Sequence, residues 1–433
     1  MKMEFNDVLH GLIQFSDKGL TPLLSELINS PEIHRLRNMR QMNFDVPLIQ
    51  ELGRSRRLPH TIGVTYLAVK LAHKSKLSLS ETKVLMTAAM LHDAAIPPYG
   101  HLVESELKVH SPNFSHEKRV RELIAGNISV KDKYTDIVPG RQLELHSILG
   151  KYGVDESSVF NKICPSDNKK SAISADIDID NIDNIHRMAV MLGWHEARIN
   201  MEGLVDSIFI KNDSLIFSKD SAVFVDKWLN YRQRIYTMII AHPECIPYNA
   251  LQADMVRIAV KNKLINSQDW SITEPEFEEK LRNNKLTRVL ASQLISGCEY
   301  QLIDYVWFKG FNSSRKYKNA EIIDRLHEDL SPAEEYGYFV WNEKGLISRK
   351  IKIGGEWGSC EVGSDSTSCL VALVKKTQGK PKRTKFEKSQ WRKDVVSVFV
   401  SLFEVEYFDV DFPEDYRGDF FRAKNNELQL GFY

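Results

Sequence analysis

The chain has 433 residues, of which 42% are hydrophobic and 27% are charged. This composition is typical of a globular protein, and the length exceeds the usual size of one domain. The 58 Lys and Arg residues balance the 58 Asp and Glu residues, so the overall charge indicates neither a nucleic-acid nor a membrane partner. The N-terminus lacks an uninterrupted apolar core, and no apolar run reaches the ~20 residues that a spanning helix needs, so we expect no signal peptide and no membrane partner. The five cysteines form no CxxC pair, which predicts free thiols and a cytoplasmic location.

Helical periodicity dominates residues 1–310. Pro59 lies in the first turn of a predicted helix that continues through TIGVTYLAVKLAHK. The capping-box pattern of Ser78 and Glu81 opens a second helix. A third predicted helix, NIDNIHRMAVMLG, ends in a glycine, and a fourth, FVDKWLNYRQRIYTMIIAH, stops at Pro243.

The sequence pattern changes after about residue 330. Apolar residues then recur at every second position, which predicts strands in LISRKIKIG, SCLVALVKK and VVSVFVSLFEVEYFDVDF. We therefore expect a mainly α protein with two domains: a helical domain over residues 1–310 and a smaller α+β region over residues 311–433. Because no long low-complexity linker separates them, we expect the second region to pack on the first.

The most informative local feature is His92-Asp93, which follows an apolar helical run and precedes Pro97-Pro98. Neighbouring side chains on a helix point about 100° apart, so two of them can bind one metal ion only where the helix ends. Two prolines end a helix, because neither has a backbone N–H group. The pattern therefore predicts that both side chains can reach one ion.

A mononuclear site needs about four ligands, and a mixture of His and carboxylate suits Mn, Fe, Co or Mg better than a closed structural zinc site. The candidates belong to three separate helical segments, as a metal site inside a bundle requires. The alternative for a single His is an ordinary hydrogen-bonded residue, and for a single acid a solvated one. Asp183 and Arg187, for instance, have the spacing of a helical ion pair. The candidates are His60, His92, Asp93 and Asp180.

Six motifs follow one another over roughly residues 4–245: Phe5-Asn-Asp-Val-Leu-His10-Gly11, Arg35-Leu-Arg37-x-x-x-Gln41, Arg57-Leu-Pro-His60-Thr-Ile-Gly63, His92-Asp93 through Glu104, Ser115-His116-Glu117 and Asp178-Ile-Asp180-Asn-Ile-Asp183. In their order and spacing they resemble the HD-domain dNTP triphosphohydrolases, the family of the bacterial dGTPases and the sterile-alpha-motif/HD enzyme. The C-terminal hundred residues carry no such resemblance.

The resemblance implies an HD-domain helical bundle that binds a divalent ion (Mn, Mg, Fe, Co or Zn) and hydrolyses nucleotides as a homo-oligomer. His116 matches the family's catalytic proton donor, and Glu104 matches the acid that orients it. A carboxylate beside an imidazole holds the tautomer and keeps a proton available for a leaving group. The family's four metal ligands match His60, His92, Asp93 and Asp180.

The resemblance also implies substrate contacts. Gln41 and Arg57 match residues that contact the nucleotide, and the alternative for each is a solvated residue at a helix end. Arg232 falls where the family has a phosphate-binding Arg, and its alternative is a solvent-facing helical residue. His101 either supports a neighbouring site residue or faces the phosphates.

Four departures from the family pattern fall at the substrate end of the site. Ile96 stands where the family usually has a second His, four residues after the His of the HD pair. Asn181, Asn184 and Met188 stand where it commonly has Lys, Tyr and Asp. The missing Lys removes a charge that would neutralise phosphate, and the missing Tyr removes a planar wall under the deoxyribose. These changes bring dNTP specificity into question and leave hydrolysis of a phosphate ester as the leading hypothesis.

The stretch Lys375–Lys393 combines nine Lys and Arg residues with Phe386 and Trp391. It could hold nucleic acid or a regulatory nucleotide, since cations bind phosphates and aromatic rings stack on bases. The alternative is a solvated loop between strands, which Gly379 and Pro381 favour.

Three functions therefore compete. The first is a metal-dependent nucleotide phosphohydrolase that converts dNTPs to deoxynucleoside and triphosphate. The second is an HD phosphodiesterase or phosphatase that acts on another nucleotide or on a nucleic-acid end. The third is a module that senses a nucleotide or nucleic acid without turnover.

Overall fold

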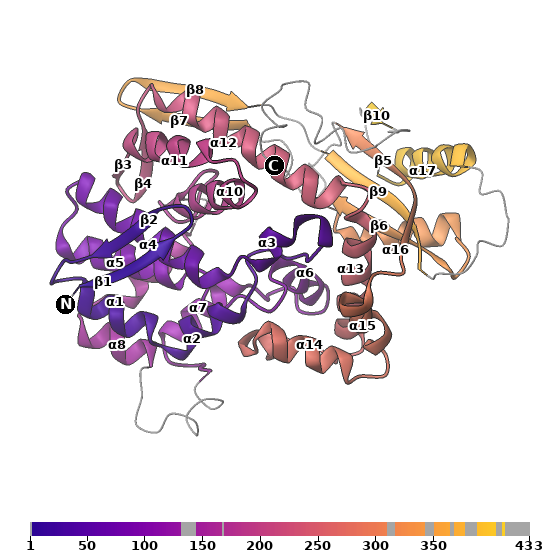
Figure 1. The fold of residues 1–433 in the computed structure, drawn as a ribbon, viewed down its shortest axis with the longest axis horizontal. Coiled ribbons are helices and arrows are strands. Elements are labelled where there is room, and N and C mark those ends of the chain that lie inside the picture. Colours follow the sequence, from indigo (N-terminus) through magenta and orange to yellow (C-terminus); the bar gives the residue numbers. More distant parts are fainter. Residues whose placement is uncertain are drawn as a thin grey trace.

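The structure is a computed structural model, and it describes residues 2–130, 144–166, 169–309, 317–342, 350–363, 368–376, 388–403 and 409–411. Helices predominate in these stretches, and the strands form one small sheet and three hairpins (Figure 1). The prediction of a mainly α protein with a smaller α+β region is therefore confirmed. In the described residues no helix is long and apolar enough to cross a membrane.

The helical part begins with the hairpin of β1 (Met3–Asp7) and β2 (Gly11–Phe15) and contains a second hairpin of β3 (Ile208–Lys211) and β4 (Ser214–Phe217). Its helices are α1 (Thr21–Ile28), α2 (Pro31–His34), α3 (Gln50–Arg54), α4 (Arg57–Lys74), α5 (Leu79–Leu91), α6 (His101–His110), α7 (His116–Ile124), α8 (Leu145–Lys151), α9 (Glu156–Ile163), α10 (Ile179–Met191), α11 (Glu196–Asp206), α12 (Ser221–Tyr236), α13 (Ile246–Lys261), α14 (Glu274–Arg282) and α15 (Arg288–Ser296). Short helical turns are η1 (Arg35–Asn38), η2 (Pro47–Ile49), η4 (Thr237–Ala241) and η5 (Asp269–Ser271).

Helices α4 and α5 pack against each other and carry the first site residues. The predicted capping box at Ser78 and Glu81 is present, with both reciprocal hydrogen bonds formed. Helix α5 ends at Leu91, however, well before the two prolines that we expected to end it. His92 is its C-terminal cap, so both residues of the HD pair lie where the helix gives way to a turn.

Helices α10 and α12 start and stop close to the predicted positions. At the start of α10 the Asp178 side chain accepts a hydrogen bond from the Asn181 backbone, which satisfies a donor at the N-terminus of the helix. Beyond its end, Gly193 has φ of 85°, a conformation that glycine adopts without strain. Helix α12 continues as the π-helical turn η4 and stops before Pro243.

The C-terminal sheet is antiparallel, and its strand order is β10-β5-β9-β6. Its first strand, β5, ends just before the predicted boundary between residues 310 and 311, so the sheet draws strands from both sides of that boundary. The strands are β5 (Gln301–Lys309), β6 (Tyr336–Asn342), β9 (Ser368–Lys375) and β10 (Asp409–Asp411); α16 (Asn319–Leu330) and α17 (Lys388–Phe403) belong to the same region.

Successive side chains of β9 point to opposite faces of the sheet, and helices cover both faces. Leu370, Ala372 and Val374 join the core that extends through the helical part, and α13 packs on this face. Val371 and Leu373 point the other way, into a separate core with α16 and α17. Figure 1 shows these two helices beyond the sheet, on the side away from α4 and α5. The C-terminal region therefore shares a continuous core with the helical part.

The predicted strand VVSVFVSLFEVEYFDVDF was wrong for its first part, VVSVFVSLF, which lies in α17, whereas Asp409–Asp411 near its end form the strand β10. The helix buries Trp391, Val395 and Phe399, whose four-residue spacing places them on one helical face. The ring of Phe399 stacks on Phe308 of β5, with centroids 3.9 Å apart. The stretch also fits a period of two, and packing on the sheet decides in favour of the helix.

The basic stretch lies mostly outside the described residues, since residues 377–387, including Phe386, are not described. Trp391 is buried in the core beside α16, so its ring is not exposed for stacking on a base. The predicted strand LISRKIKIG is β7 (Lys350–Gly355) in part, and it pairs with β8 (Gly358–Gly363). This hairpin packs on α12 and β4. The five cysteines are free, as predicted.

Candidate active site

The four candidate metal ligands come together from α4, the turn after α5, and the first turn of α10. The Nε2 atom of His60 lies 2.8 Å from a carboxylate oxygen of Asp180. The Nε2 atom of His92 lies 3.5 Å from the same oxygen and 3.8 Å from an oxygen of Asp93. The ligating atoms of His60, His92 and Asp93 all lie within 4.8 Å of one another. These residues therefore present two nitrogens and two carboxylates to one point.

The arrangement fits a divalent ion. Ligand atoms about 2.1 Å from an ion and at right angles to one another are about 3 Å apart, close to the separations seen here. His92 supports this reading most directly. Its Nδ1 atom donates to the carbonyl oxygen of Ala89 at 2.8 Å, whereas its Nε2 atom is buried without a hydrogen-bond partner. A buried nitrogen of this kind is costly unless it meets a ligand, and a metal ion would satisfy it.

The electrostatics of the cluster favour a cation. Burial alone would lower the pKa of His92, but the charges of Asp93 and Asp180 outweigh it and raise the pKa to about 9. The pKa of His60 is raised for the same reason, by contacts with Asp180 and Asp183. Burial would raise the pKa of Asp93, yet the Arg57 guanidinium, whose Nη1 atom lies 2.5 Å away, holds it far below its usual range. The carboxylates therefore remain ionised and attract positive charge.

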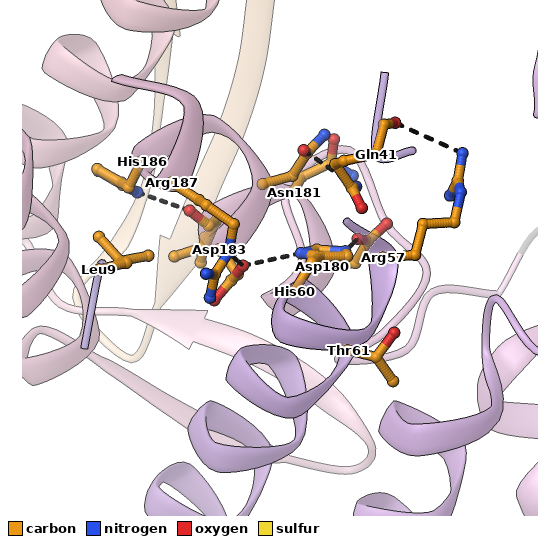
Figure 2. A network of polar contacts seen from close by, with 12 residues as sticks. Leu9, Gln41, Arg57, His60, Thr61, Asp180, Asn181, Asp183, His186 and Arg187 are labelled. Atoms are coloured by element: carbon orange, nitrogen blue, oxygen red, sulfur yellow. Dashed lines mark hydrogen bonds and ion pairs between the residues drawn. The ribbon is translucent and has the colours of Figure 1, made fainter. Parts of the chain in front are cut away.

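A buried network of hydrogen bonds holds the Nδ1 side of the His60 ring, opposite the side that faces Asp180 (Figure 2). The Nδ1 atom of His60 donates to Asp183 at 2.8 Å, which leaves Nε2 directed toward Asp180 and the other ligands. Asp183 also accepts a hydrogen bond from Nε2 of His10 at 2.7 Å and is paired with Arg187, whose Nη1 atom donates to Asp7 at 2.7 Å. The loop between β1 and β2 thus helps to orient a ligand candidate on α4.

Glycine is required on α4 for this network to form. A Cβ atom at Gly63 would lie 2.2 Å from a carboxylate oxygen of Asp183 and 2.4 Å from Arg187 Nη2. The positions of the Asp183 carboxylate and the Arg187 guanidinium in this network therefore depend on the absence of a side chain at residue 63.

We predict that Asp183→Asn lowers the affinity for Mn²⁺ by about 10- to 100-fold, the usual effect of removing a partner that orients a metal-ligating His. The amide retains the size of the carboxylate but gives up a charged acceptor for His60. Isothermal titration with Mn²⁺ measures the change. The control is Asp176→Asn, in the same acidic run, because Asp176 is exposed and paired with Lys170; this variant should retain the affinity. Equal losses in both variants would contradict the orienting role.

A second group, next to the first, contains a carboxylate–imidazole pair. Glu104 on α6 lies 3.1 Å from Nδ1 of His116 and also accepts a hydrogen bond from the His116 backbone at 3.3 Å. His101 and Lys108 contact the same carboxylate, at 2.9 and 3.0 Å. Burial would raise the pKa of Glu104, but hydrogen bonds from His101 and His116 hold it well below its usual range. An ionised Glu104 orients His116 so that its Nε2 atom faces away from the pair.

The candidate substrate residues are placed as follows. Arg57 and Gln41 are both buried, and they contact each other through the Gln41 backbone oxygen (Figure 2). Arg232 is buried on α12, where its guanidinium lies over the ring of Tyr236. The alternatives that Gln41 and Arg57 are solvated residues at helix ends, and that Arg232 faces solvent, are therefore wrong. His101 is exposed, and its ring lies 5.4 Å from that of His116.

The four departures from the family pattern differ in their surroundings. Ile96 and Met188 are buried in the hydrophobic core. Asn184 accepts a hydrogen bond from Gln41 at 3.2 Å, and Asn181 is bonded to Asp178 at 2.9 Å. Asn184 follows Asp180 by four residues and so lies on the same side of α10, and both asparagines supply neutral amides in place of a charged and an aromatic side chain.

Sequence reasoning missed part of the site. Asp183 and Arg187 do form the expected ion pair, but the contact from Asp183 to His60 could not be inferred from helical spacing. His10 belonged to the first motif, although its partner was unknown. The contact between Lys108 and Glu104 could have been predicted, because Lys108 follows Glu104 by four residues on one helix.

Comparison with known proteins identifies one domain of the chain. Residues 57–188 match the HD domain family, and this segment contains all four candidate ligands together with Glu104 and His116. Residues 57–188 therefore form an HD domain. The match ends within α10, so the family assignment covers the metal cluster and the carboxylate–imidazole pair but not the C-terminal sheet.

Relatives of this HD-domain protein include an uncharacterised protein, YwfO of Bacillus subtilis, which is 23% identical over 244 residues. That match covers 55% of this chain and 52% of YwfO, so the chain aligns with about half the length of that relative. The deoxynucleoside triphosphate triphosphohydrolase SAMHD1 of Mus musculus is 33% identical over 36% of this chain and 23% of its own. A crystal structure of a hypothetical protein from Aquifex aeolicus has a similar fold, with a TM-score of 0.57 and 16% identity over 92% of this chain and 100% of its own.

Proposed function

We propose that this HD-domain protein is a metal-dependent nucleotide phosphohydrolase, and that its substrates are dNTPs, which it cleaves to deoxynucleoside and triphosphate. The observation that carries the proposal is the convergence of His60, His92, Asp93 and Asp180 beside the pair of Glu104 and His116. The similarity to SAMHD1 proteins supports the choice of dNTPs.

In this proposal the four ligand candidates hold one divalent ion, which would act as a Lewis acid on a phosphate oxygen and would help to activate water. Arg57 and Arg232 neutralise phosphate charge, and Gln41 contacts the nucleotide. His116 donates the proton that the leaving oxygen needs, because Glu104 fixes its orientation. His101 stands next to His116 on the open side of the site.

The reaction balances as a hydrolysis. Water adds to phosphorus and the bond from phosphorus to the ester oxygen breaks. The electron pair stays on the leaving oxygen, which takes a proton from His116. The proton lost by the water passes to solvent, and His116 regains its own proton from solvent. The products are an alcohol and a phosphate.

The four residues that depart from the family pattern favour a second enzymatic function. Ile96 and Met188 are core residues, and Asn181 and Asn184 supply amides in place of a charged and an aromatic side chain. With less positive charge near the ion, a phosphodiesterase or phosphatase acting on another nucleotide or a nucleic-acid end is the alternative. A sensing module without turnover has no physical need for four convergent ligands.

One assay tests the proposal. The protein is loaded with Mn²⁺ or Mg²⁺ and offered dNTPs, NTPs, cyclic nucleotides and short oligonucleotides, and the products are identified. We expect deoxynucleoside plus triphosphate from dNTPs, with activity lost on addition of a chelator. Pyrophosphate or monophosphate products would select the alternative enzyme instead. Absence of turnover across the panel would overturn both enzymatic functions.

Homo-oligomer formation and a cytoplasmic location are part of the same proposal. Gel filtration with light scattering tests the first, and fluorescence microscopy of the tagged protein in cells tests the second. Binding of nucleic acid or a regulatory nucleotide at Lys375–Lys393 remains a weaker proposal, because Trp391 is buried.

A further inference from the structure

A cavity of about 410 Å³ lies between the HD domain and the C-terminal region. One wall is formed by α6 together with Asn43 and Phe44, and the opposite wall by the start of α16 and the edge strand β6. This volume lies in the range of small-molecule binding pockets. None of the four metal-ligand candidates, all of them described, is among the residues that line it.

The cavity adjoins the candidate acid, His116, through residues of α6. Its lining includes His101 and Lys108, the two residues that contact Glu104 beside His116. Ser105 and Val109 lie on the same side of α6 and also line the cavity, whereas Glu104 is buried. The cavity therefore meets the site at the candidate acid and away from the metal cluster.

The position of the cavity beside His116 determines which part of the substrate can enter it, because phosphoryl transfer has a defined geometry. The attacking and leaving oxygens lie roughly in line, on opposite sides of phosphorus. The group that protonates the leaving oxygen must stand on the leaving side. If His116 is that group, the leaving alcohol extends past His116 and His101, toward this cavity.

The lining suits a flat heteroaromatic ring. The aromatic side chains of Phe44, Phe339 and Trp341 form one apolar patch, with the ring of Phe44 6.4 Å from Phe339 and 5.7 Å from Trp341. Two amides stand beside this patch. Asn319 Oδ1 accepts from the backbone of Asn342, which leaves its Nδ2 group as a donor. Asn342 Nδ2 donates to a backbone oxygen, which leaves its Oδ1 atom as an acceptor.

We propose that this cavity receives the leaving group of the reaction, that the leaving group is an alcohol carrying a flat heteroaromatic ring such as a nucleoside, and that the C-terminal region thereby determines substrate specificity. The inference rests on the proposed hydrolysis. It assigns a role to a part of the chain that lies outside the HD domain match.

The test fills the cavity from the C-terminal wall. Ala320 lines the cavity at the start of α16, and Ala320→Trp places an indole there. The matched control, Asp329→Trp, puts the same group on the opposite face of the same helix, since nine residues rotate a helix by about 900°, or half a turn beyond two full turns. Deoxynucleosides and inorganic triphosphate are titrated into the Mn²⁺-loaded protein by calorimetry.

We expect Ala320→Trp to weaken deoxynucleoside binding at least tenfold and to leave triphosphate binding unchanged, while Asp329→Trp changes neither. Ser105→Trp, from the α6 wall, serves as a second blocking variant if the first does not fold as judged by circular dichroism. Unchanged deoxynucleoside affinity in a folded blocking variant would overturn the inference, as would a wild-type protein that binds no deoxynucleoside.

The outcomes separate this inference from the proposed function. Turnover of dNTPs by the wild-type protein, together with unchanged nucleoside affinity in the blocked variants, would overturn the cavity assignment alone. Nucleoside binding that is lost in the blocked variants, without turnover of any nucleotide, would overturn the hydrolase alone and retain the cavity as a site for the heteroaromatic ligand.

Discussion

Replacement of Asp180 by alanine is expected to abolish high-affinity metal binding and to lower nucleotide turnover by about three orders of magnitude. Metal-ion catalysis supplies several kcal/mol, and each 1.36 kcal/mol is worth about tenfold in rate. Asp180 lies close to both imidazoles of the cluster, 2.8 Å from His60 and 3.5 Å from His92, so its loss removes one ligand and one negative charge. Calorimetry with Mn²⁺ and steady-state kinetics measure the two effects.

The chain offers a control four residues earlier. Asp176 belongs to the same acidic run, but it is exposed and paired with Lys170 at 2.5 Å. Asp176→Ala should therefore retain metal affinity and turnover, because exposed ion pairs contribute little to stability. If both variants bound Mn²⁺ as the wild-type protein does, Asp180 would not be a ligand.

The place of each ligand candidate on its own helix or turn could be predicted because it depends on local rules. His92 and Asp93 follow each other at a helix end, and His60 lies in the first turn of another helix. The sequence placed each of them correctly on an element, and the resemblance supplied the expectation that the elements meet. The detailed reason for the helix end was wrong, since α5 stops at Leu91 without the prolines.

What could not be predicted depends on contacts between residues far apart in the sequence. His10 and Asp183 are separated by 173 residues, and no local pattern pairs them. Residues of α17 satisfy the period of a strand and that of a helix, so only the sheet beneath them decides. The cavity requires α6 and β6 to face each other, which the sequence of neither element shows.

In the proposed mechanism the two groups of the site have separate tasks, and this separation predicts distinct phenotypes. Asp180 would bind the ion and Asp183 would orient His60, whereas Glu104 contacts His116 and the cavity-lining residues of α6. A defect in the first group should appear in metal affinity. A defect in the second should appear in proton transfer to the leaving group, with the metal affinity unchanged.

His116→Gln is expected to lower kcat by about 10²- to 10⁴-fold, the usual contribution of general acid catalysis. Glutamine retains polarity at this position but cannot donate an acidic proton. His110→Gln, an exposed position on α6, serves as the control and should leave kcat unchanged. Mn²⁺ stoichiometry and affinity should match the wild type in both variants. The atoms of His101, Glu104 and His116 also lie within 4.8 Å of one another, so a lower stoichiometry in His116→Gln would indicate a second ion there instead of an acid.

The leaving group distinguishes a proton donor from a residue that only binds substrate. A nucleoside leaves as a basic alkoxide unless it is protonated, whereas 4-nitrophenolate is stable as an anion near neutral pH. The loss of activity in His116→Gln should therefore be large with the nucleotide and less than about tenfold with a 4-nitrophenyl ester of the same phosphate. An equal loss with both leaving groups would show that His116 binds the substrate and does not protonate it. In that case the argument that directs the leaving group toward the cavity beside α6 would also fail.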